Sequence, residues 1–185
     1  PAMVADIARS YITGLEASGV GATVKHFPGL GRVRADTHHF SADLDTPLQE
    51  LEASDWILFR KALASTMAQL MIGHVTLTSV DPERPASHSR LVVDGIVRKK
   101  WNYQGVTITD DLVMGAIYQR NVCTAVVEAL NAGVDLLLVA FAAPSALACR
   151  PDAGFCIGRM LAQEAYVLGA GLLLYRSEEH TSELQ

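Results

Sequence analysis

The order of apolar and polar positions predicts that helices and strands alternate along most of the chain. Apolar residues recur at helical spacing in four segments, each followed by a short apolar run typical of a buried strand. The helices are expected at residues 2–18, 47–66, 92–100 and 124–131. The strands are expected at residues 22–27, 68–75, 105–110 and 134–140. Strands that are apolar on both faces and separated by helices indicate a parallel sheet covered by helices.

Only four strands are predicted, and that number limits the fold. A closed (β/α)8 barrel needs eight strands and usually at least about 200 residues, whereas this chain has 185. The chain is therefore either a small open α/β sheet or part of a barrel. The pattern weakens after residue 142 and makes no prediction for residues 150–175. The polar residues 176–185 resemble the translation of a sequencing-library adapter, and we exclude them from the site.

The composition narrows the class of protein. Half of the residues are hydrophobic and 19% are charged, a balance typical of a folded soluble domain. The 20 acidic residues outnumber the 15 basic ones, which argues against a nucleic-acid-binding protein. The absence of a run of about 18 apolar residues argues against a membrane-spanning helix. The three cysteines form no CxxC pair, so we expect neither a disulfide framework nor a thiolate zinc site, and we expect a reducing compartment.

Polar residues follow or end three of the predicted strands. Lys25 and His26 end the first, His74 lies near the end of the second, and Asp110 and Asp111 end the third. In parallel α/β folds the carboxyl ends of the strands form the ligand-binding face. We therefore expect these side chains to gather into a functional site, with Asp111 turned away to bind backbone or loop donors.

A polar loop adds a second feature, the pair Asp36 and His38, two residues apart. A carboxylate that accepts from one imidazole nitrogen fixes the tautomer and raises the basicity of the other nitrogen. Such a pair can deliver and recover a proton near neutral pH. Asp-x-His is common by chance, and on spacing alone the neighbouring His39 is an equally good candidate.

These residues lie within motifs that resemble a known family. KHFPGLG at residues 25–31, followed by RADTH at residues 34–38, is similar to the signature of glycoside hydrolase family 3, and in particular to its bacterial β-N-acetylglucosaminidase branch. Leu30 departs from the histidine that this branch often carries. The later motifs follow in the family's order: GHV (73–75), DPERPA (81–86), VTITDDLVM (106–114) and ALNAGVDLLLV (129–139).

The resemblance implies a fold and a set of residue roles. The family fold is a (β/α)8 barrel, and residues 1–149 match about its last four β/α units, so we expect a partial barrel truncated at the N-terminus. The resemblance makes Asp110 the nucleophile and His38 the general acid/base, with Asp36 as its partner. The residues that it assigns to sugar binding are Lys25, His26 and His74.

The activity implied is that of a retaining exo-β-N-acetylglucosaminidase. It would release terminal GlcNAc from peptidoglycan fragments in the bacterial cytoplasm, through a glycosyl-enzyme intermediate. No metal or organic cofactor is expected, and the expected partner is a carbohydrate rather than a nucleic acid or a membrane. Three alternatives stay open: a family 3 phosphorylase, an inactive half-barrel with an exposed sheet edge, and a barrel hydrolase with a divalent metal. The ligands of that metal would be His26, His38, His74 and Asp110.

Overall fold

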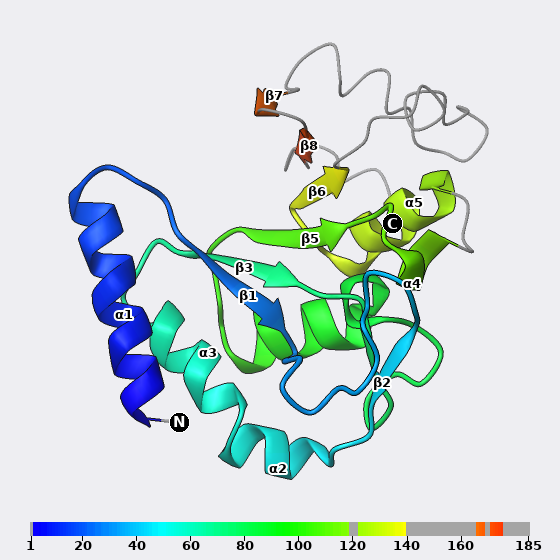
Figure 1. The fold of residues 1–185 in the computed structure, drawn as a ribbon, viewed down its shortest axis with the longest axis horizontal. Coiled ribbons are helices and arrows are strands. Elements are labelled where there is room, and N and C mark those ends of the chain that lie inside the picture. The colour runs from blue at the N-terminus through cyan, green and yellow to red at the C-terminus, as the bar shows by residue number, and fades with distance from the viewer. Residues whose placement is uncertain (1, 119–121, 140–165, 169–170, 176–185) are drawn as a thin grey trace.

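Residues 2–118, 122–139, 166–168 and 171–175 are described by a computed structural model of the chain. Strands β1, β3, β5 and β6 lie side by side in that order, and all neighbouring pairs among them are parallel (Figure 1). The α/β class and the parallel strand order are therefore confirmed. The elements of this part, in chain order, are α1 (Ala2–Ala17), β1 (Thr23–Phe27), α2 (Leu48–Ala53), α3 (Trp56–Leu63), β3 (Gln69–Ile72), η2 (Leu91–Lys100), β5 (Thr107–Asp111), α4 (Gly115–Tyr118), α5 (Val122–Ala132) and β6 (Leu136–Val139).

The predicted strand at residues 68–75 is wrong at its end, because the chain changes sheets there. Strand β3 stops at Ile72, and a separate strand β4 (Val75–Leu77) pairs in parallel with β2 (Ala42–Leu44). Apolar residues stand on both sides of Gly73 and His74, so the sequence pattern does not show where the chain leaves the first sheet. His74 therefore lies between two sheets rather than within a strand.

The predicted helix at residues 47–66 is two helices, α2 and α3, which meet at Ser54 and Asp55. The Ser54 hydroxyl oxygen lies 2.7 Å from the carbonyl oxygen of Glu50 and 2.6 Å from the Asp55 carboxylate, and these two acceptors share its one proton. Arg32, from the loop after β1, binds Glu50 at 2.6 Å and Asp55 at 2.9 Å. This ion pair lowers the pKa of Asp55 and ties the base of the loop to the helix junction.

The main core packs between β1 and the helices. Phe27, at the end of β1, lies with its ring centroid 5.2 Å from Trp56, 5.4 Å from Phe59 and 4.9 Å from Trp101. The indole N–H of Trp56 donates to the carbonyl of Pro28 at 2.9 Å. The core therefore holds the segment that directly follows Lys25 and His26.

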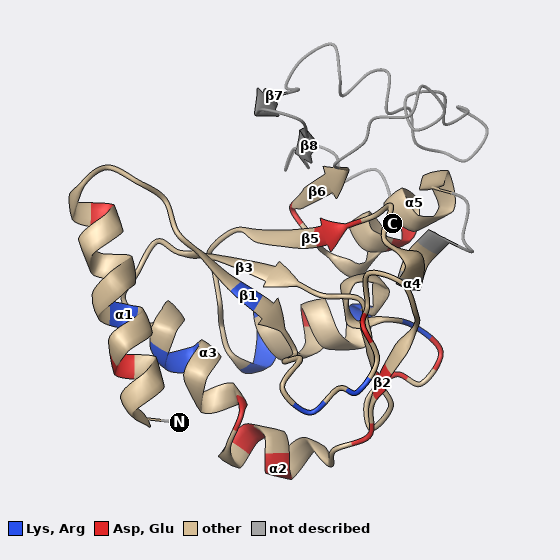
Figure 2. Cartoon of the chain, viewed as in Figure 1, with Lys and Arg blue, Asp and Glu red and all other residues tan. Residues whose placement is uncertain are grey.

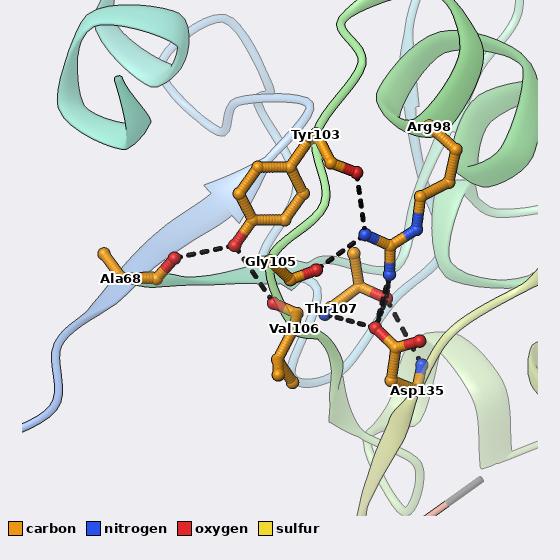
Figure 3. Close-up of polar contacts among 7 residues, drawn as sticks. All are labelled: Ala68, Arg98, Tyr103, Gly105, Val106, Thr107 and Asp135. Atoms are coloured by element: carbon orange, nitrogen blue, oxygen red, sulfur yellow. Dashed lines mark hydrogen bonds and ion pairs between the residues drawn. The ribbon is translucent and has the colours of Figure 1, made fainter. Parts of the chain in front are cut away.

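A polar network fastens η2 to the amino ends of β5 and β6 (Figure 3). Arg98 donates to the carbonyls of Tyr103 and Gly105, at 2.9 and 2.6 Å, and pairs with the carboxylate of Asp135. Asp135 also accepts the backbone N–H and the hydroxyl of Thr107. Burial raises the pKa of Tyr103 to about 12. Thr107 begins β5 whereas Asp110 lies near its end, so this network belongs to the scaffold.

Two further strands extend the sheet beyond β6. Strand β8 (Gly171–Tyr175) pairs antiparallel with β6, and β7 (Tyr166–Leu168) pairs antiparallel with β8. The pattern at residues 150–175 did not predict them. The remaining expectations, for residues 150–165 and for the tail at 176–185, lie outside the described residues.

Two expectations from the composition concern membrane-spanning helices and the state of the cysteines. None of the described helices is both long and apolar enough to cross a membrane. Cys149 and Cys156, on which the expectation about the cysteines also depends, lie outside the described residues.

Candidate active site

The carboxyl ends of three parallel strands meet at one edge of the main sheet. Phe27 of β1 is in register with Ile72 of β3, and Ile72 is in register with Thr109 of β5. His26 precedes Phe27 and Asp110 follows Thr109, so strand register brings these two site candidates to the same edge. Figure 2 shows a basic segment on β1 and an acidic segment at the end of β5.

Asp110 lies at this edge with a side chain that is 15% exposed. Its Oδ1 accepts the backbone N–H of Asp111 at 2.9 Å, and its Oδ2 lies 3.6 Å from Nε2 of His26. Asp111 instead accepts the N–H of Val113 through Oδ1 at 3.1 Å, so the prediction that it binds a backbone donor is confirmed. The two adjacent carboxylates therefore serve different purposes.

His26 is half-buried, and burial lowers the pKa of its imidazole more than the attraction of Asp110 raises it. The ring is therefore neutral near pH 7, with one nitrogen that donates and one that accepts. Such a ring suits a sugar hydroxyl, which also both donates and accepts. Lys25, on the same strand, is exposed.

Asp36 and His38 form the pair that their spacing predicts. Oδ1 of Asp36 lies 2.7 Å from Nδ1 of His38 and also accepts the backbone N–H of His38 at 2.9 Å. These bonds, the backbone one foremost, lower the pKa of Asp36. The ring of His39 packs against Phe40 instead, with centroids 6.2 Å apart. The side chains of Asp36 and His38 are 59% and 71% exposed, so Nε2 of His38 is open to a ligand.

His74 is buried, and both of its ring nitrogens have partners within the protein. Nε2 lies 3.0 Å from the carbonyl of Asp111, and Nδ1 lies 2.7 Å from the hydroxyl of Ser87. A carbonyl can only accept, so Nε2 donates, and the Ser87 hydroxyl then donates to Nδ1. Ser87 in turn accepts from Nδ1 of His88 at 2.8 Å. This chain of hydrogen bonds holds the backbone immediately after Asp110.

Ser87 and His88 were not predicted from the sequence. They follow the DPERPA motif directly, and the loop is held because buried Asp81 accepts the Ser89 hydroxyl at 2.7 Å. Their position beside a motif is a signal, but it does not reveal that they contact His74.

The burial of His74 also bears on the metal alternative, because its Nε2 already donates to a carbonyl. Across the described residues, no group of three or more His, Cys, Asp or Glu side chains is arranged to hold a metal ion.

Two histidines whose pKa values are lowered by burial, His26 and His74, predict how stability depends on pH. Burial lowers the folded-state pKa of His26 and His74 below the ordinary value of 6.5. As the pH falls through 6.5 the unfolded chain binds protons first, so stability is complete above about pH 6.5 and is lost toward the lower folded-state values. We expect the free energy of unfolding, measured in urea, to be smaller at about pH 5.5 than at about pH 7.5.

The control for this prediction compares two histidine variants. His74→Gln removes one of the two titrating groups and should flatten the pH dependence, whereas His39→Gln, in the exposed loop, should leave it unchanged. An equal slope in His74→Gln and the wild type would contradict the prediction.

The fold and the site together indicate a parallel α/β enzyme, because in such enzymes the active site lies at the carboxyl ends of the strands. In this chain that edge holds the carboxylate of Asp110, and the loop after β1 holds the Asp–His pair. The sequence model of the glycosyl hydrolase family 3 N-terminal domain matches residues 1–148, and the chain belongs to this family. A beta-hexosaminidase of Tolumonas auensis is 38% identical over 140 residues, which cover 75% of this chain and 42% of that protein. The chain thus spans less than half the length of this relative.

Solved structures of family members resemble the fold. A family 3 β-N-acetylglucosaminidase from Paenibacillus is 31% identical with a TM-score of 0.69, over 86% of this chain and 35% of that one. NagZ from Neisseria gonorrhoeae, in complex with N-trifluoroacetyl-D-glucosamine, is 34% identical with a TM-score of 0.62, over 69% of this chain and 36% of that one. The partial-barrel expectation agrees with these likenesses.

Proposed function

We propose that this chain carries the catalytic face of a retaining exo-β-N-acetylglucosaminidase that releases terminal GlcNAc from peptidoglycan fragments. The main support is the placement of Asp110 beside His26, at the edge where the Asp36–His38 loop attaches through the backbone of Gly115. The names of the relatives, beta-hexosaminidase and β-N-acetylglucosaminidase, support the same activity. An N-acylated glucosamine bound to NagZ supports the substrate class.

The proposed reaction uses one carboxylate and one imidazole. Oδ2 of Asp110 attacks the anomeric carbon while the bond to the leaving oxygen breaks, and the protonated Nε2 of His38 gives that oxygen its proton. Water then attacks the anomeric carbon, His38 takes the proton back, and the Asp110 carboxylate leaves. Asp36 stays ionised throughout, because its two bonds to His38 stabilise the charged carboxylate. Two displacements at one carbon give net retention.

The remaining assignments follow from exposure and from the family resemblance. Lys25 and His26 lie on β1, His26 beside Asp110, and both are proposed to hold sugar hydroxyls, while His74 binds the carbonyl of Asp111 and so supports the backbone after Asp110. A carbohydrate is the proposed partner. A cytoplasmic location is proposed from the family resemblance.

A phosphorylase is the second candidate, because the proposed acid/base is an imidazole rather than a carboxylate. A carboxylate that had given up its proton would repel an incoming phosphate, whereas the imidazole of His38 is neutral after the same step and does not. Phosphate would replace water in the second displacement and give GlcNAc 1-phosphate.

The test is the hydrolysis of 4-nitrophenyl N-acetyl-β-glucosaminide by the chain, in phosphate and in a non-nucleophilic buffer, with the first anomer identified by NMR. We expect β-GlcNAc first, at a rate independent of phosphate. GlcNAc 1-phosphate would instead indicate the phosphorylase, and α-GlcNAc first would contradict retention. Loss of turnover in chelator would indicate the metal-dependent hydrolase. No product in either buffer would overturn the proposal and favour the inactive half-barrel.

A further inference from the structure

The loop that carries Asp36 and His38 is attached to the segment that follows Asp110. The backbone N–H of Gly115 donates to the carbonyl of His38 at 2.8 Å. Gly115 is the first residue of α4, and the first N–H groups of a helix have no acceptor within the helix. The carbonyl of the acid/base histidine therefore satisfies a donor that the helix leaves free.

The contact at Gly115 is too close for any other residue. A Cβ atom built on Gly115 would lie 2.5 Å from the carbonyl oxygen of His39, 2.6 Å from its carbonyl carbon and 2.7 Å from its Cα. These are backbone atoms, so no rotamer change can relieve the overlap. The φ angle of Gly115 lies outside the positive range that favours glycine. Glycine is therefore required here by the approach of the loop and not by its own backbone conformation.

The segment between Asp110 and Gly115 is held firmly, so its two ends move together. The carbonyl of Asp111 accepts from the imidazole of His74 and from the N–H of Met114, at 3.0 and 3.1 Å. The N–H of Leu112 donates to a carbonyl of β6 at 3.0 Å, and the side chains of Leu112 and Met114 are buried. A displacement at Gly115 would therefore change the position of the loop relative to the carboxylate of Asp110.

Hydrogen bonds within the loop also order the turn that carries Asp36 and His38. The carbonyl of Asp36 accepts the N–H groups of His39 and Phe40, at 3.1 and 2.9 Å, and the side chain of Asp36 binds His38. Thr37, between the two, is buried. The turn at residues 36–40 is thus a compact unit that rests on Gly115.

We propose that Gly115 is a positioning residue that docks the Asp36–His38 turn and so sets the distance between the proton donor and the nucleophile. The part that concerns catalysis rests on the proposed glycosidase function. A side chain at position 115 pushes the turn away from Asp110, and the leaving oxygen then departs without its proton. The loss in kcat/KM must therefore be greatest for substrates whose leaving group needs protonation.

The first test measures docking without using activity. Gly115→Ala is compared with Gly14→Ala, since Gly14 has no atom within 4 Å of a built Cβ. Trypsin cleavage after exposed Arg34 should be about tenfold faster in Gly115→Ala than in the wild type and unchanged in Gly14→Ala. In the unmodified protein, hydrogen exchange of the Gly115 amide should be slowed by about tenfold or more. Unchanged cleavage in a folded variant, or an unprotected amide in the wild type, would overturn the proposal.

The second test measures the effect on catalysis through two leaving groups. We expect Gly115→Ala to lower kcat/KM for phenyl N-acetyl-β-glucosaminide by about 10- to 100-fold. For the 2,4-dinitrophenyl glycoside, whose leaving group needs no proton, the loss should be less than about threefold. An equal loss with both substrates would refute a role in proton donation. If the wild type hydrolyses neither, the proposed function falls, while the docking test still stands.

Discussion

Asp110→Asn is expected to lower kcat/KM for aryl N-acetyl-β-glucosaminides by about 10³-fold or more. An amide oxygen cannot form the glycosyl-enzyme bond that the carboxylate forms, so the first displacement is lost. The substitution keeps the shape of the side chain, and Oδ1 of the asparagine can still accept the N–H of Asp111 as in the wild type. The loss is therefore one of chemistry, and the measurement is steady-state hydrolysis with a check of folding by circular dichroism.

Asp111→Asn is the matched control, because it places the same change on the next residue. Asp111 accepts the N–H of Val113, a bond that an asparagine can also make, so the turn should persist. We expect less than about a tenfold loss in kcat/KM. Azide added to Asp110→Ala should restore turnover and yield the α-glycosyl azide. Equal losses at both positions, or a larger loss at Asp111, would remove Asp110 from the nucleophile role.

Trp56→Ala is expected to lower the free energy of unfolding by about 3–5 kcal/mol. The indole is fully buried and packs against the rings of both Phe27 and Trp101. Its removal leaves a large cavity beneath the end of β1 and deprives the carbonyl of Pro28 of its hydrogen bond. Urea unfolding of both proteins at one pH measures the difference.

Two variants separate the packing of Trp56 from its hydrogen bond. Trp56→Phe keeps much of the ring and loses the bond to Pro28, which should cost about 1–3 kcal/mol. Met67→Ala removes a side chain that is 88% exposed and should change the free energy by less than about 0.5 kcal/mol. A loss in Trp56→Ala no greater than in Met67→Ala would show that the core does not depend on this ring.

The four parallel strands of the main sheet could be predicted because each carries its own apolar run between helices, whereas β7 and β8 were not predicted. The prediction failed where an element depends on a distant partner. Strand β2 lies in a polar loop and exists only because β4 pairs with it. The apolar run at residues 68–75 hides a change of sheet at Gly73 and His74, which no local period can reveal.

The contacts of the candidate site also fall into two groups, those that local spacing predicts and those that depend on distant segments. The spacing of Asp36 and His38 predicted their contact, because a side chain can reach back two residues within one turn. The contact between His26 and Asp110 depends on the register of β1, β3 and β5. No pattern near Gly115 indicates that the backbone of His39 lies against it.

By itself, the sequence determined the alternation of helices and strands and the local Asp–His pair, since these depend on neighbours only a few residues apart. It also determined the family, because the family's motifs are read directly from the order of the residues. Only the tertiary structure decided that His74 is buried with internal partners, that Asp110 lies beside His26, and that Gly115 contacts the loop that carries Asp36 and His38. The physical reason is that backbone geometry gives helices and strands their periods locally. Burial and close approach, in contrast, arise only when segments far apart in the chain pack against one another.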